Sequence, residues 1–177
     1  MEKILFLCLI IFSFSCFGEE GSNDHKILSL LNGMYEVVSW FDGKTLHEPP
    51  TVSGRWVFYD GKIISSIHNR TNENKNKSSF KWGHGSVVDG MFRYTYTETL
   101  NVKGIDKFAK MNRNLPWSGM RTFKVTLRNN EIEMTSLNGK QTWKITKDGM
   151  VYTDPEWSDD KIFVERKWKR ITPLTKN

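Results

Sequence analysis

Short stretches of alternating apolar and polar residues, separated by turn residues, make up most of the chain after Gly33. Such alternation is typical of β-strands that bury one face. The only helical pattern runs from Asp24 to Leu31, with Asp24 as its N-cap. No internal repeat or domain linker interrupts the pattern, so we expect a single all-β domain.

Two turns in the second half of the chain impose a register that can be tested. A two-residue turn pairs the residues that flank it, and paired residues share a face of the sheet. A turn at Asn129-Asn130 pairs Val125 with Met134, and a turn at Asn138-Gly139 pairs Met134 with Trp143. Both turns give the same apolar face, which supports three antiparallel strands.

Further turns are marked by three Asp-Gly pairs: Asp60-Gly61, Asp89-Gly90 and Asp148-Gly149. We expect the last turn to set Ile145 against Val151. From Tyr35–Trp40 to Lys161–Ile171, the pattern predicts about nine strands in up-and-down order. A sheet of consecutive antiparallel strands leaves its first and last strands with unpaired backbone groups, and closing the sheet into a barrel pairs these two strands. The expected fold is therefore an up-and-down antiparallel barrel with a short N-terminal helix, and a β-sandwich is the alternative.

Residues 1–18 have the pattern of a secretory signal peptide. The apolar run from Ile4 to Cys16 is too short to cross a bilayer and fits a signal h-region. Cleavage after Gly18 would leave residues 19–177 as a periplasmic or secreted domain. Alternatively, Ser15-Cys16 resembles a lipobox, in which a lipidated Cys16 would anchor the protein to the outer membrane.

Composition limits the chemistry of the remaining chain. Both cysteines, Cys8 and Cys16, lie in the signal segment, so we expect no disulfide and no thiolate site. The histidines are scattered, and we expect no metal or organic cofactor. The net charge of +6 favours solubility, or association with anionic surfaces or an acidic ligand. We expect four acidic residues near the last turn to be solvated: Asp154, Glu156, Asp159 and Asp160.

The segment from Asn101 to Arg121 fits no hairpin. It is about 20 residues long and rich in large apolar side chains. We interpret it as a flap over one end of the barrel, or as a plug that belongs to the core.

Two motifs resemble lipocalin-like proteins. Residues Leu31–Trp40 (LNGMYEVVSW) resemble the opening of that family, where a short helix leads into Gly-x-Trp, here with Tyr35 in place of the tryptophan. Residues Gly54–Lys62 resemble the second hairpin of bacterial lipocalin-like domains. The family also packs a last-strand arginine over the first-strand tryptophan, and Arg166 and Arg170 are candidates. The resemblance implies a calycin-type barrel that holds a small, mainly apolar molecule.

The hairpin at Asp89-Gly90 carries the most specific candidate site. A simple hairpin register sets Lys81 opposite Glu98, a charge pair suited to the solvent side. The residues that would then point inward are Trp82, His84, Arg93 and Thr95. An aromatic ring, an imidazole and a guanidinium would suit a ligand with an apolar body and a carboxylate or carbonyl head.

The opposite assignment turns Phe92, Tyr94 and Tyr96 inward and leaves His84 in water. Ligand pockets are lined mostly by apolar and aromatic groups with a few polar ones. The candidate ligand-binding residues are Trp56, Trp82, His84, Arg93, Tyr94 and Trp143.

We therefore expect an exported, monomeric barrel that binds a small hydrophobic or amphipathic ligand and no nucleic acid. One alternative is an interaction or inhibitor module that uses Asn69–Ser79 and Asn101–Arg121. Another is an enzyme with His84 as acid or base. An internal cavity of roughly 300 Å³ or more would favour the ligand-based hypotheses, and a solid interior would favour the interaction module.

Overall fold

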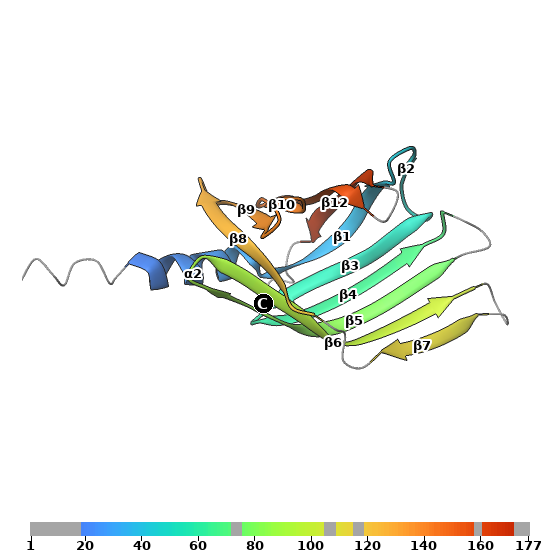
Figure 1. Cartoon of the computed structure of the whole chain (residues 1–177), viewed down its shortest axis with the longest axis horizontal. Coiled ribbons are helices and arrows are strands. Elements are labelled where there is room, and N and C mark those ends of the chain that lie inside the picture. The colour runs from blue at the N-terminus through green and yellow to red at the C-terminus, as the bar shows by residue number, and fades with distance from the viewer. Residues whose placement is uncertain (1–18, 72–75, 105–108, 115–118, 158–160, 172–177) are drawn as a thin grey trace, which may run out of the picture.

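A computed structural model shows the chain as a closed antiparallel β-barrel with a helix at one end (Figure 1). It describes residues 19–71, 76–104, 109–114, 119–157 and 161–171. The predicted signal segment, with Cys8, Cys16 and the cleavage site after Gly18, lies outside the described residues.

The described elements are α2 (Glu19–Leu31), β1 (Gly33–Phe41), β2 (Leu46–His47), β3 (Val52–Tyr59), β4 (Lys62–Asn69), β5 (Lys77–Val88), β6 (Met91–Lys103), β7 (Lys110–Asn114), β8 (Arg121–Arg128), β9 (Glu131–Ser136), β10 (Thr142–Ile145), β11 (Gly149–Trp157) and β12 (Ile162–Ile171). Within this part of the chain, pairing of β1 with β12 closes a barrel of ten strands, and β2 and β7 lie outside it. The predicted up-and-down barrel is confirmed, and the sandwich alternative is wrong.

Local turn chemistry sets most of the registers. The turn at Asn129-Asn130 has positive φ at both residues and pairs Val125 with Met134, as predicted. Met134 also pairs with Trp143, which confirms the continuous apolar face.

The turn after β10 differs from the prediction by one residue. Thr146 N–H donates to the Gly149 carbonyl at 2.9 Å, so two residues rather than three form the loop. Ile145 therefore pairs with Met150 instead of Val151. This register turns Met150 and Tyr152 into the core.

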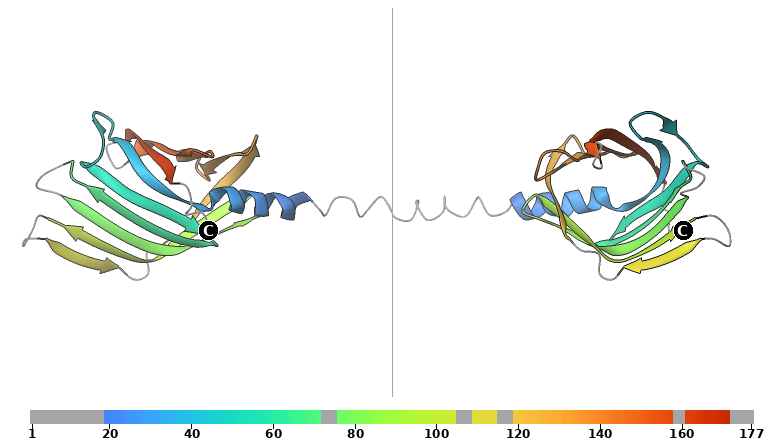
Figure 2. Two further views of the ribbon diagram at one scale, coloured as in Figure 1. Left: turned by 180° about the vertical axis from the view of Figure 1, so that it is seen from behind. Right: turned by 45° about the vertical axis from the view of Figure 1, so that its right-hand side comes forward.

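Helix α2 lies at one end of the barrel (Figure 2). It begins at Glu19, so Asp24 lies within the helix and is not its N-cap. The Asp24 carboxylate instead accepts hydrogen bonds from the backbone N–H groups of Asp89 (2.9 Å) and Gly90 (3.1 Å), in the β5–β6 turn. Because Leu31 is fully buried in the barrel core, the helix closes this end.

Arg170 on β12 joins the helix to the first and last strands. Its guanidinium lies 4.7 Å from the centre of the Tyr35 ring and donates to the carbonyls of Leu30 and Asn32, both at 2.7 Å. The Tyr35 hydroxyl donates to the Leu31 carbonyl at 3.1 Å, and burial raises the pKa of Tyr35 to about 12. Both candidate arginines pack over β1: Arg170 over Tyr35, which stands where the motif has tryptophan, and Arg166 over Trp40 near the end of the strand.

The segment from Asn101 to Arg121 contains a hairpin that the sequence did not predict. Strand β6 continues to Lys103, and β7 pairs with its second half. Strand β8 pairs only with the first half of β6, from Met91 to Tyr94. Part of the expected flap is therefore an edge strand that extends the sheet past the barrel, while residues 105–108 and 115–118 lie outside the described part.

Replacement of Arg170 tests this junction. Arg170→Ala removes a donor from the carbonyls of Leu30, Asn32 and Thr146 and uncovers Tyr35. We therefore expect the free energy of unfolding to fall by about 2–4 kcal/mol. Urea denaturation measures the change. The exposed Arg128 serves as control, and Arg128→Ala should change stability by less than about 0.5 kcal/mol. Equal effects of the two substitutions would contradict a structural role for Arg170.

Candidate functional site

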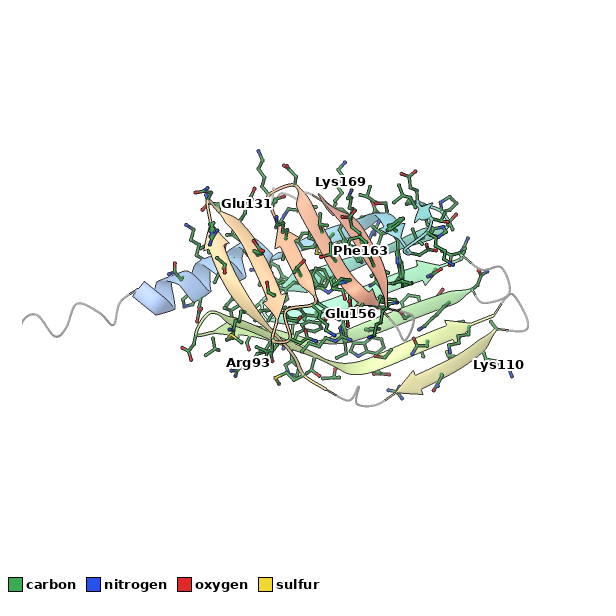
Figure 3. All side chains as sticks on the ribbon, turned by 45° about the horizontal axis from the view of Figure 1, so that its top comes forward. Arg93, Lys110, Glu131, Glu156, Phe163 and Lys169 are labelled. Atoms are coloured by element: carbon green, nitrogen blue, oxygen red, sulfur yellow. The ribbon has the colours of Figure 1, made fainter. Side chains whose placement is uncertain are left out.

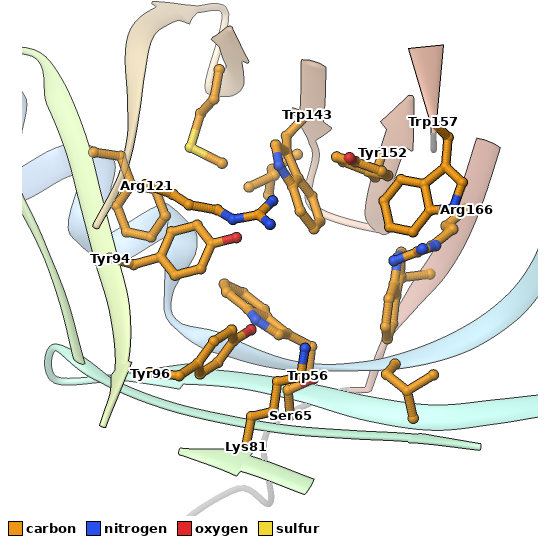
Figure 4. A pocket seen from close by; sticks show the side chains of 15 residues that line it. Trp56, Ser65, Lys81, Tyr94, Tyr96, Arg121, Trp143, Tyr152, Trp157 and Arg166 are labelled. Carbon is orange, nitrogen blue, oxygen red and sulfur yellow. The ribbon is translucent and has the colours of Figure 1, made fainter. Parts of the chain in front are cut away.

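A cavity of about 120 Å³ lies inside the barrel (Figure 4). Lys81 and Trp157 are among its lining residues, whereas the β5–β6 turn at Asp89 lies beside helix α2. The cavity therefore lies toward the end away from the helix. Aromatic side chains form much of the wall, including those of Trp56 and Tyr94.

The structure separates the six predicted ligand-binding residues into two groups. Trp56, Tyr94 and Trp143 come together around the cavity. The other three lie on the outside of the barrel: Trp82, His84 and Arg93. The inward placement expected for these three is therefore wrong, and so is that of Thr95, which pairs with His84. His84 does not reach the cavity, which removes it as an acid or base for a ligand held there.

A β-bulge explains this error. Gly83 pairs with Tyr96, as the hairpin register predicts, but Trp82 pairs with Glu98, which leaves one extra residue on β6. A β-carbon at Gly83 would collide with the carbonyl oxygen of Thr95, so the close approach of the two strands requires glycine.

The bulge separates Lys81 from its expected partner. Lys81 pairs with Thr99 and lines the cavity, whereas Glu98 lies on the other face of the sheet and forms an ion pair with Arg113. The assignment that turns Phe92, Tyr94 and Tyr96 inward is the correct one.

Three cationic side chains line the cavity: Lys81, Arg121 and Arg166. Figure 4 shows the two arginines entering it from opposite sides. Arg121 donates a hydrogen bond to the Tyr94 hydroxyl. None of the described lining residues is Asp or Glu. The described wall is therefore positively charged.

Arg166 is held by aromatic faces. Its guanidinium lies 3.9 Å from the centre of the Trp40 ring and 4.6 Å from that of Trp157. Such cation–π contacts replace part of the lost hydration. Burial nevertheless lowers the pKa of Arg166 to about 10.

The carboxylate that acts on Arg166 belongs to Asp154, outside the lining of the cavity. Asp154 is only 4% exposed, which corrects the expectation that it is solvated. It accepts hydrogen bonds from the Tyr152 hydroxyl (3.1 Å) and the Gln141 amide (2.9 Å). These contacts hold the carboxylate away from a ligand.

Lys81 is a second cation of the cavity with a lowered pKa. Burial lowers the pKa of its ammonium group to about 8, and the positive charges of Lys77, Arg121 and Arg166 lower it further. Near neutral pH, Lys81 is therefore charged but easily deprotonated.

Several buried N–H groups around the cavity have no hydrogen-bond partner among the described residues. They are Nε1 of Trp143, Nε1 of Trp168 and Nε of Arg166. Unpaired buried donors cost free energy, and each needs an acceptor. These three N–H groups are enclosed by the surrounding side chains and do not open into the cavity. What the cavity offers a ligand is its positive charge.

The sequence also contains a pattern that predicts the inward position of Arg121 and Arg166. Arg121 lies two residues before the inward-facing Phe123, and Arg166 lies between Val164 and Trp168, both buried. Because side chains two apart share a face of a strand, this alternation places both arginines inside.

No family model, curated protein or solved structure matches this chain. Fold and site therefore define a class: a closed antiparallel barrel with an aromatic, cationic cavity. No helix in the described residues is long and apolar enough to cross a membrane. In the same residues, no three His, Asp or Glu side chains gather as a metal site would require.

The perturbed pKa of Lys81 predicts a pH-dependent stability. Between about pH 8 and the ordinary lysine value of 10.5, the unfolded chain binds a proton that the folded protein has lost, so stability rises with pH across this window. Lys81→Met removes this rise. At pH 7 we expect the variant to be more stable by on the order of 1 kcal/mol, since the ammonium is still partly hydrated.

Urea denaturation at neutral and alkaline pH measures the difference, which should vanish near pH 10.5. The exposed Lys144 on β10 provides the control, because Lys144→Met should leave the pH dependence unchanged. A rise in stability that survives Lys81→Met would contradict the placement of Lys81.

Proposed function

We propose that this protein is an exported, lipocalin-like barrel that binds a small anionic ligand with a single ring or a short apolar body. The observation that carries the proposal is the cavity wall, where Lys81, Arg121 and Arg166 lie among aromatic side chains with no described carboxylate. The sequence predicted a small hydrophobic or amphipathic ligand, and the charged wall favours an amphipathic acid.

A carboxylate on the ligand would supply the negative charge that the cavity wall lacks. Charges taken out of water are stabilised by an opposite charge and by hydrogen bonds to it. Arg121 and Arg166 are suited to hold a carboxylate, since guanidinium groups form charge-assisted, often bidentate, hydrogen bonds with it.

The volume of the cavity restricts the apolar part of the ligand. Pockets for drug-sized molecules occupy roughly 300–1,000 Å³, and this cavity has about 120 Å³. An engineered apolar cavity of about 150 Å³ binds benzene in another protein. The cavity falls short of the volume of roughly 300 Å³ set above as favouring a ligand. It leaves room for about one ring, so the proposed ligand is smaller than expected.

Two features support the lipocalin-like and exported parts of the proposal. The closed barrel, its N-terminal helix and the packing of Arg170 on Tyr35 fit the calycin-type pattern. The signal pattern of residues 1–18 supports export. Cleavage after Gly18 would release the barrel, and lipidation of Cys16 would tether it.

Three ligands of nearly equal size test the charge preference. Benzoate, benzyl alcohol and benzylamine carry a negative, neutral and positive head on one ring. We expect calorimetry or tryptophan fluorescence to show tight binding of benzoate alone. Arg166→Met should weaken it by about 10–100-fold, the equivalent of one lost charge-assisted hydrogen bond.

Arg93 provides the matched control, because it lies on the outside of the same barrel. Arg93→Met should leave benzoate affinity unchanged, and thermal melts would verify that both variants are folded. Benzyl alcohol binding as tightly as benzoate would contradict the proposal, as would equal effects of the two substitutions.

A further inference from the structure

Beyond the closed part of the barrel, β4 to β7 continue as a projecting sheet (Figure 1). Its inner face continues the wall of the cavity, because side chains two apart share a face of a strand. Lys81 lines the cavity, so Ser79 and Lys77 point to the same side of β5. Their partners on β6 are Asn101 and Lys103.

Three lysines form a row across this face. Lys77 pairs with Lys103, and Lys103 pairs with Lys110 on β7. Neighbouring strands lie about 4.8 Å apart, so the three side chains start within about 10 Å of one another. Like charges in such positions repel. All three are exposed, and none forms an ion pair with a described Asp or Glu residue.

The next row toward the cavity is polar. Ser79 pairs with Asn101, and Asn101 pairs with Asn112. Two amide groups thus lie beside the lysines, whereas Ser79 is buried at 8% exposure. We call the other five residues the lysine platform: Lys77, Asn101, Lys103, Lys110 and Asn112. Side chains with this chemistry form hydrogen bonds with hydroxyl groups and ion pairs with acidic groups.

We propose that the lysine platform binds an acidic polysaccharide. A chain of sugars offers hydroxyl groups to Asn101 and Asn112, and regularly spaced acidic groups to the lysine row. Such a polymer cannot enter a cavity of about 120 Å³, so this site is independent of the proposed small ligand.

The composition and shape of the platform disfavour other polyanionic or acidic partners. Single-stranded nucleic acids stack their bases on aromatic side chains, and the platform has none. The cores of protein interfaces are enriched in aromatic and apolar residues, which the platform also lacks. Its register with Lys81 places it on the cavity side of the sheet, which is concave in Figure 2.

Binding of polygalacturonate, measured by calorimetry, tests the proposal. We expect the wild-type protein to bind this polymer and not neutral dextran. The triple variant Lys77→Gln/Lys103→Gln/Lys110→Gln should bind at least about tenfold more weakly and with a smaller salt dependence, because fewer counterions are released. Benzoate should still bind in the cavity, weakened only by loss of the Lys77 charge that acts on Lys81. This outcome separates the test from that of the proposed function.

A second triple variant makes the same change in net charge elsewhere. Lys124, Lys144 and Lys169 are exposed and lie outside the platform (Figure 3 shows Lys169). Lys124→Gln/Lys144→Gln/Lys169→Gln should change the affinity by less than about twofold.

Three results would overturn the proposal. The first is an equal loss of affinity in both triple variants, which would indicate net charge alone. The second is tighter, platform-dependent binding of polyglutamate, an oligonucleotide or anionic vesicles, which would assign the platform to another partner. The third is absence of polygalacturonate binding by the wild-type protein.

Discussion

Lys81, Arg121 and Arg166 place positive charge inside a closed barrel, in a cavity that no described Asp or Glu residue lines. Charges withdrawn from water destabilise a fold unless aromatic faces, hydrogen bonds or opposite charges replace the lost hydration. Trp40 and Trp157 do so in part for Arg166. An acid bound in the cavity would stabilise these charges.

The rest of the fold keeps this cavity in place. Helix α2 and the Arg170–Tyr35 contact close the end of the barrel away from it. The bulge at Gly83 brings two strands into close approach and leaves Lys81 inside while Glu98 turns outward. The same strands then run past the barrel and carry the lysine platform. One irregularity in the β5–β6 hairpin thus connects the closed core to the projecting sheet.

The sequence predicted what depends on local chemistry. Asn and Gly residues that favour tight turns fixed the registers of most hairpins, and from them the closed barrel followed. The bulge depends on the distance between two backbones, which alternation along one strand does not encode. A register without the bulge therefore assigned the inner face of the β5–β6 hairpin to the outside. As a result, Trp82 and His84 were predicted to point inward. Strand β7 was missed because its five residues show no apolar alternation.

Proton exchange on ligand binding tests the central claim most directly. Benzoate is fully ionised at about pH 8.5, where Lys81 is only partly protonated, and a bound anion beside the lysine raises its pKa. Calorimetry in two buffers of different ionisation enthalpy should therefore show net proton uptake on binding, and Lys81→Met should abolish it. Binding without proton uptake, or with proton release, would contradict a cationic binding cavity that includes Lys81.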